Sequence, residues 1–352
     1  MRTLLFLLLG SLAVADEIIV RDADSLRAAL RDLKKGSTIK IAPGDYPGGH
    51  SISGIERLTI ESLDAKNPPH FKGGANAWHF SRCNDLTLRN LRVSGQTGNG
   101  LNLDDGGELA NPTTGITIER VEISDIGPKG NHDGIKCSGL DKLTIRYCTI
   151  TGWGGQGIDF VGCHHSLVTN CRFVGKEGFT GSAGIQLKGG TSDVIIEKCN
   201  FTNAGERPIN LGGSTGLPYF RPQGAKFEAA RLIVRNNTIE GSLCAAAFVG
   251  VDGAELSGNT ILFPTKWIFR ILQETKEPGF VPCRNVLVKE NKISFRRSEV
   301  QTELNIGPDT NPETFRFENN RWFAEDKPQA SKPKLPVEEK DGVYGVDPRE
   351  AI

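Results

Sequence analysis

Charged and amide residues recur at one position of a short repeated motif. The motif is a glycine followed by an apolar, a polar and an apolar residue, as in Gly134-Ile135-Lys136-Cys137 and Gly157-Ile158-Asp159-Phe160. Alternation along an extended strand turns the two apolar residues to one face and the polar residue to the other. If these strands stack, one outward row is predicted to contain Asn102, Lys136, Asp159, Gln186 and Asn210.

Two flanking rows extend this polar surface. The next outward positions are Asp104, Ser138, Val161, Lys188 and Gly212, and the preceding turn carries Asn99, Asp133, Gln156, Ala183 and Arg207. Because stacked strands lie ~4.8 Å apart, the charged members are expected within roughly 20 Å of one another. The predicted patch consists of Asp104, Asp105, His132, Asp133, Lys136, Asp159, Lys188, Arg207 and Asn210.

These residue types suit the cleavage of a uronic-acid polymer by β-elimination. The reaction needs a cation on the substrate carboxylate, a base for the proton α to it, and a proton for the leaving oxygen. A lysine acts as the base when burial or neighbouring cations lower its pKa. Lys136 lies one strand from Asp159, which favours the charged ammonium. Lys188 has Val161 and a glycine as row neighbours, with Arg207 nearby, so it is the better candidate base.

The acidic residues keep other functions open. Asp133 and Asp159 on adjacent strands have the types needed for the acid and base of a glycoside hydrolase. Calcium takes oxygen ligands in flexible geometry, so four carboxylates of the patch form a candidate calcium site. A carbohydrate-binding or cell-envelope protein without catalysis is the third interpretation, because outward polar residues on a repeat protein are usually solvated. The candidate calcium ligands are Asp104, Asp105, Asp133 and Asp159.

An insertion directly after Asn210 supplies candidate substrate contacts. It runs from Gly212 to Arg221 and contains two adjacent aromatic residues. Aromatic faces stack on sugars, and an arginine pairs with carboxylates. The candidate substrate-binding residues are therefore His132, Gln186, Asn210, Tyr219, Phe220 and Arg221.

A repeat of 22 to 38 residues organises the whole chain. Its clearest copy, Leu143-Thr144-Ile145 to Cys148-Thr149-Ile150, has the period of two that is typical of strands. No copy has a helical period, which excludes helical and leucine-rich repeats. The eight cysteines indicate either a disulfide framework or a buried thiol stack, and the ladder favours the stack. Residues equivalent to Cys148 are Leu63, Leu91, Val121, Cys171, Cys199, Asn237, Asn259, Asn291 and Asn320.

Stacked strands separated by Gly and Asn turns predict an all-β fold, a right-handed parallel β-helix of about ten coils. The open first coil needs a cover, and Asp24-Ser25 followed by spaced apolar residues predicts an N-terminal capping helix. The expected organisation is a signal peptide (1–15), a cap region (16–36), the β-helix (37–325) and a C-terminal tail (326–352).

The cap and repeats resemble the pectate-lyase-like β-helix superfamily over roughly residues 20–325. Within it, Ile185-Gln186-Leu187-Lys188-Gly189 is similar to the lysine motif of the alginate lyase and chondroitinase B family. In that family a lysine at this strand position is the base, so the resemblance implies the same role for Lys188.

Two positions depart from the pattern of that family. Gly212 stands where the family has an arginine one coil later, and Arg207 is our candidate substitute. Gly181 and Ala183 stand where the family has acidic calcium ligands just before the lysine.

The net charge and the N-terminal sequence limit which partners and which location are expected. With 42 basic and 42 acidic residues, the chain has no bulk positive charge for nucleic acid. Met1 to Ala15 carries one arginine, an apolar run and Ala13-Val14-Ala15, which predicts a cleaved signal peptide. No later segment has the ~20 apolar residues of a membrane span. We therefore expect a secreted or periplasmic monomer whose partner is an anionic polysaccharide.

Overall fold

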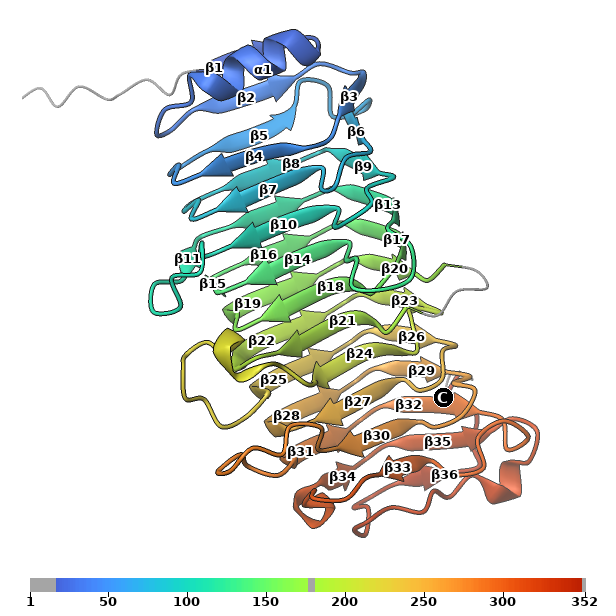
Figure 1. The fold of residues 1–352 in the computed structure, drawn as a ribbon. Coiled ribbons are helices and arrows are strands. Elements are labelled where there is room, and N and C mark those ends of the chain that lie inside the picture. Colours follow the sequence, from blue (N-terminus) through green and yellow to red (C-terminus); the bar gives the residue numbers. More distant parts are fainter. Residues whose placement is uncertain (1–16, 177–180, 350–352) are drawn as a thin grey trace, which may run out of the picture.

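The structure is a computed structural model that describes residues 17–176 and 181–349. Three long sheets, in which every strand pair is parallel, stack along one axis with α1 (Ala23–Arg31) at one end (Figure 1). The predicted all-β, parallel β-helix with a capping helix is confirmed. The predicted signal peptide lies outside the described residues.

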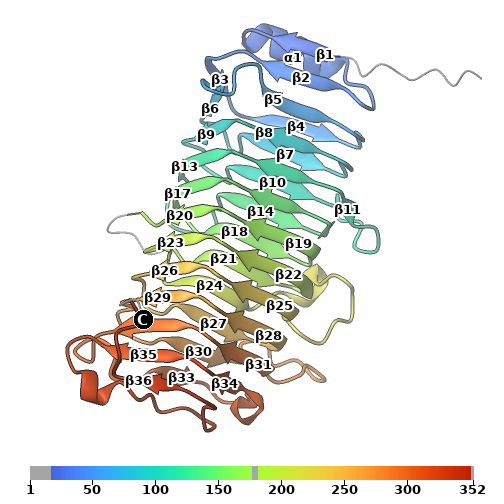
Figure 2. The ribbon, with the colours of Figure 1, turned by 180° about the vertical axis from the view of Figure 1, so that it is seen from behind.

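Sheet A has 14 strands. They are β1 (Glu17–Val20), β2 (Thr38–Ile41), β5 (Thr59–Ser62), β8 (Thr87–Arg89), β11 (Thr113–Thr114), β12 (Thr117–Glu119), β15 (Leu140–Asp141), β16 (Thr144–Arg146), β19 (His164–Thr169), β22 (Thr191–Glu197), β25 (Ala229–Arg235), β28 (Val251–Ser257), β31 (Arg284–Lys289) and β34 (Arg316–Glu318). Seen from behind, these strands form a continuous column (Figure 2).

Sheet B has 12 strands. They are β3 (Asp45–Pro47), β6 (His70–Lys72), β9 (Arg92–Ser94), β13 (Glu122–Ile126), β17 (Thr149–Trp153), β20 (Arg172–Val174), β23 (Asn200–Thr202), β26 (Thr238–Glu240), β29 (Thr260–Leu262), β32 (Lys292–Phe295), β35 (Arg321–Ala324) and β36 (Val343–Tyr344). Within the described residues, three short 3-10 helices lie in loops: η1 (Leu217–Tyr219), η2 (Pro312–Thr314) and η3 (Pro328–Ala330).

Sheet C has ten strands and carries the predicted polar rows. They are β4 (His50–Ser53), β7 (Trp78–Ser81), β10 (Leu101–Asp104), β14 (Ile135–Ser138), β18 (Gln156–Val161), β21 (Ala183–Lys188), β24 (Arg207–Gly212), β27 (Ala246–Val249), β30 (Phe269–Leu272) and β33 (Leu304–Ile306). The middle strands form the front column of Figure 1.

The glycine that opens each sheet C motif is required by close stacking of the coils. A Cβ on Gly134 would lie 2.5 Å from the carbonyl oxygen of Gly157, and one on Gly157 would lie 2.6 Å from that of Gly184. Side chains at these positions would therefore push successive coils apart. The glycine therefore marks where each sheet C strand begins and is needed for the close spacing of successive coils.

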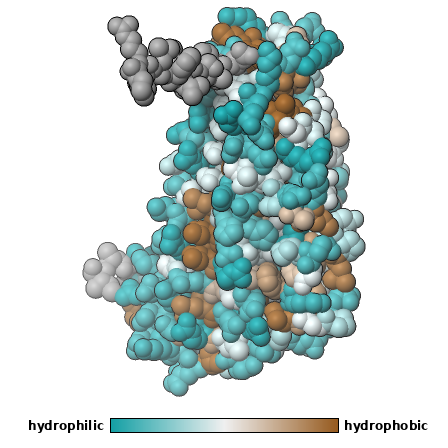
Figure 3. All heavy atoms as spheres, turned by 90° about the vertical axis from the view of Figure 1, so that its left-hand side faces the viewer, coloured by the Kyte–Doolittle hydropathy of each residue, from teal (hydrophilic) through white to brown (hydrophobic). Residues whose placement is uncertain are grey.

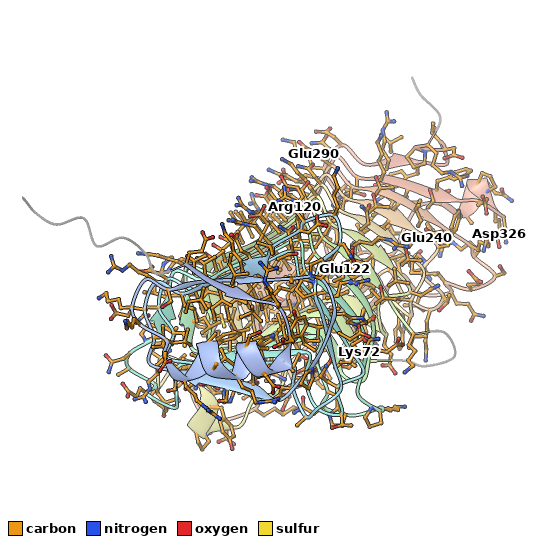
Figure 4. All side chains as sticks on the ribbon, turned by 90° about the horizontal axis from the view of Figure 1, so that it is seen from above. Lys72, Arg120, Glu122, Glu240, Glu290 and Asp326 are labelled. Atoms are coloured by element: carbon orange, nitrogen blue, oxygen red, sulfur yellow. The ribbon has the colours of Figure 1, made fainter. Side chains whose placement is uncertain are left out.

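The turn from sheet A to sheet B is made by one residue in the left-handed region. Its φ lies between +50° and +62° in nine coils, and it directly precedes the repeated ladder position. Figure 4, viewed from above, labels two of these residues, Arg120 and Glu290, along the same edge of the stack. The turn residues are Asn90, Arg120, Tyr147, Asn170, Lys198, Asn236, Gly258, Glu290 and Asn319.

The predicted interior ladders are present, with one error. Nδ2 of Asn237 donates to Oδ1 of Asn259 at 3.0 Å, and the chain of amide bonds continues through Asn291 to Asn320. All eight cysteines are buried and free, as the thiol stack predicts. Leu63, however, is 40% exposed, because the insertion after β5 displaces it from the ladder.

The ends of the stack are both covered. Asp22, not Asp24, caps α1: its Oδ1 accepts from the amide of Ser25 at 2.8 Å. Leu26 and Ala29 of α1 are buried against the first coil. At the other end the tail adds β36 to sheet B beside β35, and Glu339 accepts from the amide of Asn320.

Candidate functional site

The central outward row of sheet C has the predicted register. Asn102 pairs with Lys136, Lys136 with Asp159, Asp159 with Gln186, and Gln186 with Asn210. The inward neighbours of Lys136, Ile135 and Cys137, are fully buried. The row therefore presents its polar side chains to one face of the stack, at about 4.8 Å per coil.

Asp159 is the centre of a buried charge cluster. Its Oδ2 contacts Nζ of Lys136 and lies 3.3 Å from Nζ of Lys188. Nζ of Lys136 is also 3.6 Å from Oδ2 of Asp133. Both carboxylates have no exposed surface, whereas the lysine side chains are 16–18% exposed. Two ammonium groups thus cover two buried carboxylates.

The carboxylate of Asp159 has a second lysine partner, Lys188, that the row analysis does not predict. Lys188 was expected to have uncharged row neighbours, but the structure places the carboxylate of Asp159 within ion-pair distance of it. The lysine side chain spans the gap between rows, because its four methylenes carry the ammonium well beyond its own strand position. Lys188 and Lys136 therefore share one carboxylate.

The pKa values of Asp133 and Lys136 are both raised, for different reasons. Burial, together with the nearby charge of Asp159, raises the pKa of Asp133 to about 6. Burial lowers the pKa of Lys136, but attraction by Asp159 and Asp133 outweighs it, and the net pKa is raised. Lys136 therefore remains a cation, which disfavours it as a base.

Asp133→Asn should flatten the pH dependence of stability between about pH 4 and pH 6. A carboxyl whose pKa rises on folding stabilises the fold below its unfolded pKa, and this contribution is lost as pH rises through the folded pKa. A shift from 3.8 to about 6 corresponds to roughly 3 kcal/mol. Urea denaturation across this range checks it; parallel profiles for the two proteins would contradict the assignment.

A cleft of about 280 Å³ lies beside this cluster, over β18, β21 and β24. Lys188 and Arg207 both line it, and Nη1 of Arg207 is 3.4 Å from Oε1 of Glu274 and 3.5 Å from Oδ1 of Asn210. Asp133, Asp159 and Lys136 do not line it. We call it the Lys188 cleft; it is formed by Gln156, Ser182, Gln186, Lys188, Glu206, Arg207, Asn210, Ser214 and Glu274.

Sequence reasoning missed several lining residues. Nε2 of Gln156 donates to Ser182 at 2.7 Å and to Oε1 of Gln186 at 2.8 Å, which fixes both amides. Glu206 directly precedes Arg207 in the sequence, so its position at the cleft could have been inferred from the turn row that contains Arg207. Glu274 follows β30 and reaches Arg207 from 67 residues away, beyond the reach of local patterns.

A family comparison identifies the architecture. A family model described as right handed beta helix region matches residues 74–261, more than half of the chain. The chain belongs to this right-handed β-helix family. No curated protein matches the chain.

Solved structures share the right-handed β-helix at low identity. An alginate lyase from Paenibacillus sp. str. FPU-7 is 18% identical, with a TM-score of 0.55 over 84% of this chain and 97% of the other. A lacto-N-biosidase from Eubacterium ramulus is 11% identical, with a TM-score of 0.60 over 94% and 68%. The Streptococcus pneumoniae surface protein and adhesin PfbA is 14% identical, with a TM-score of 0.52 over 85% and 80%. These likenesses show the fold.

A long loop of the β-helix begins at the edge of the Lys188 cleft, to which it contributes Ser214. This wall loop, residues 213–228, contains η1 and projects beside β22 and β25 (Figure 1). Arg221 makes a bidentate contact with Asp105, at 2.5 Å and 2.9 Å, and both side chains are buried. Glu228 accepts from the amides of Gly189 and Thr215 at 2.9 Å and 2.8 Å. The loop is thus anchored at both ends.

Two expected substrate contacts in the wall loop are wrong. Phe220 is 2% exposed and packs edge-on against Phe280, so its face is not open to a sugar. Arg221 is 8% exposed and held by Asp105, so it is not free for a substrate carboxylate. Tyr219 is 64% exposed. Figure 3 shows one face of the molecule, on which polar side chains predominate and apolar patches are separate.

Arg221→Ala should loosen the wall loop. The change removes two charge-assisted hydrogen bonds and leaves Asp105 buried without its cation. Amide exchange across residues 213–228 should become at least about ten-fold faster. Arg231→Ala is the matched control, because Arg231 pairs with Asp193 at 2.8 Å on the exposed surface. Equal exchange in both variants would show that the buried pair is not the anchor.

The acidic residues do not fit a calcium site. Oδ2 of Asp104 is 2.7 Å from Nε2 of His79, and Asp105 is occupied by Arg221. The other two carboxylates are covered by lysines, so a cation would meet ammonium groups before it met oxygens. Within 17–176 and 181–349 no group of three or more His, Cys, Asp or Glu side chains has a metal-binding arrangement.

The remaining candidate, His132, lies in the turn before β14. Its carbonyl oxygen accepts from the amides of Gly154 and Gly155, and its ring is half-buried outside the Lys188 cleft. In the described part of the chain, the one α-helix and the 3-10 helices are too short to span a membrane.

Proposed function

We propose that this protein is a polysaccharide lyase that cleaves an anionic, uronate-containing polysaccharide by β-elimination, with Lys188 as the base. One observation carries the proposal: Lys188 and Arg207 line the same cleft, whereas the buried carboxylates do not. An approaching polymer meets a lysine and an arginine there, beside Glu206 and Glu274. This is the pair of groups that elimination next to a carboxylate requires.

The reaction follows from the positions of these two groups. The guanidinium of Arg207 pairs with the substrate carboxylate and stabilises the negative charge that develops there. Nζ of Lys188 accepts the proton from the carbon α to that carboxylate. The electron pair of the broken C–H bond forms a carbon–carbon double bond, and the β C–O bond breaks. The leaving oxygen takes a proton from the Lys188 ammonium or from water.

Lys136 supports Lys188 through the shared carboxylate. Because Lys136 remains charged and contacts the same oxygen, Asp159 retains a counter-ion when Lys188 gives up its proton. Asp159 therefore orients the Lys188 side chain without requiring its charge. Lys136 and Asp159 are positioning residues in this scheme.

Hydrolysis is the second candidate, favoured by two glutamates that line the Lys188 cleft. Glu206 and Glu274 both reach this space, whereas the pair expected from the sequence, Asp133 and Asp159, is covered. A glycoside hydrolase needs two carboxyl groups that flank the scissile bond. The shared fold leaves both reaction classes and binding without catalysis open to test.

The test is incubation with alginate, pectate and a glycosaminoglycan, each with and without a chelator. The proposal predicts a rise in ultraviolet absorbance from an unsaturated uronate with at least one polymer. Reducing ends without that absorbance would indicate hydrolysis. Retarded migration in a polysaccharide gel without either product would indicate a binding protein.

We also propose that the chain is exported after removal of residues 1–15. The support is the sequence pattern of the first fifteen residues. N-terminal sequencing of the secreted or periplasmic protein should begin at Asp16. Recovery of an intact Met1 in that fraction would contradict the proposal.

A further inference from the structure

A second cationic position continues the outward row of sheet C beyond the Lys188 cleft. Asn210 pairs with Ala247, Ala247 with Arg270, and Arg270 with Asn305. Arg270 is thus two strands beyond Asn210, or about 10 Å along the axis. It faces outward on the same side of the stack as Lys188 and Arg207.

The guanidinium of Arg270 is held in place but has no anionic partner. Its Nε donates to Oδ1 of Asn305 at 2.9 Å, and its carbon lies 4.7 Å from the ring centroid of Trp267. Across residues 17–176 and 181–349, no carboxylate lies within ion-pair distance of Arg270, and its Nη atoms make no hydrogen bond. Asn305 and Trp267 therefore orient a planar fork whose outer edge is free.

Positive charge accumulates around this fork. Nζ of Lys266 lies 4.4 Å from the centroid of the same Trp267 ring. Burial, and then the charge of Arg207, lower the pKa of Arg270, so the two guanidinium groups act on each other across the intervening coil, and the charges of Glu274 and Glu206 offset this only in part. At the row position between them, that coil contributes only Ala247. A bound anion would relieve this repulsion.

The opposite side of the Lys188 cleft has a different charge. On that side the same row carries Lys136, which is paired with buried carboxylates, and then Asn102 and His79, both bonded to the carboxylate of Asp104. An acidic polymer therefore meets a carboxylate on that side, whereas Arg270 on the other side has no ion-pair partner among the described residues. We therefore expect the polymer to extend from the Lys188 cleft toward the C-terminal coils.

We propose that Arg270, supported by Lys266, Trp267 and Asn305, is a second binding subsite for a carboxylate of the same uronate polymer. The inference rests on the proposed function and assigns the direction in which the polymer lies. Arginine suits this role because its two Nη atoms match the two oxygens of a carboxylate. At roughly one sugar unit per coil, the carboxylate bound at Arg270 lies about two units from the one at Arg207.

The experiment compares short and long oligouronates in binding. Oligogalacturonates and oligomannuronates of two and six units are titrated by calorimetry into Lys188→Ala protein, which prevents turnover, with and without Arg270→Gln. The subsite predicts that Arg270→Gln weakens binding of the six-unit probe by about ten-fold or more and leaves the two-unit probe unchanged, because two units span only one coil step. Neutral maltohexaose controls for charge.

Arg284→Gln is the matched control, because it removes the same charge from sheet A, where Arg284 pairs with Asp252 at 2.9 Å. Equal affinities of the six-unit probe with and without Arg270→Gln would overturn the subsite. Equal weakening of both probe lengths would also overturn it, since the residue would then act on the Lys188 cleft itself. The outcome is separable from the lyase proposal: length-dependent loss of binding supports the subsite even where wild-type protein forms no unsaturated product.

Discussion

Lys188→Ala should lower the rate of unsaturated-product formation by about 10²–10⁴-fold, the range expected for loss of a general base. The side chain lines the cleft and lies 3.3 Å from Asp159, so its removal leaves the substrate carbon without a proton acceptor. Arg207, which pairs with the substrate carboxylate, remains in place. The effect should therefore fall mainly on kcat and less on KM. Initial rates of the absorbance change, with circular dichroism to verify the fold, provide the measurement.

Lys289→Ala is the control for this experiment. Lys289 also makes an ion pair at 3.3 Å, with Glu255 on sheet A, away from the cleft. Its replacement should leave the rate unchanged. A Lys188→Ala protein that is folded and turns over like wild type would remove Lys188 from the mechanism.

Lys136→Met should destabilise the fold by about 3–5 kcal/mol at neutral pH. Lys136 contacts Asp159 and lies 3.6 Å from Asp133, and both carboxylates are fully buried. Without this ammonium they repel each other in a poorly solvated space. The loss should be smaller below about pH 6, where Asp133 is protonated. Urea denaturation at the two pH values provides the measurement.

Two further variants separate this effect from a general loss of lysine. Lys40→Met removes an exposed pair with Glu17 and should change the free energy of unfolding by about 0–1 kcal/mol. Asp159→Asn combined with Lys136→Met should restore part of the stability, because it removes one uncompensated charge. Equal stabilities of Lys136→Met and Lys40→Met would contradict the buried cluster.

The rows of sheet C were predictable because two local rules determine them. Alternation sets which residues face outward, and the glycine before each strand sets where the strand begins, so the pairing of Lys136 with Asp159 follows from sequence alone. The N-terminal helix was predictable from its apolar spacing. Leu63 was misplaced because the inserted turn after β5 breaks the count on which the ladder depends.

Contacts between rows were not predictable in the same way. The contact of Lys188 with Asp159 depends on the length of a side chain, and the contact of Arg221 with Asp105 depends on the path of a loop across several coils. Row analysis treats each side chain as perpendicular to its strand. It therefore also misses Glu274, whose side chain reaches the cleft from a later coil. The full set of residues that line the cleft could be identified only from the structure.

The most direct test of the central claim is the fate of water oxygen during cleavage. The polysaccharide that gives product is digested in heavy-oxygen water, and the oligosaccharides are analysed by mass spectrometry. β-Elimination at the Lys188 cleft predicts an unsaturated end, with a product mass lower by one water than that of the saturated oligosaccharide, and no heavy oxygen introduced at the cleaved bond. Saturated products that carry heavy oxygen from the cleaved bond would contradict the account and indicate hydrolysis.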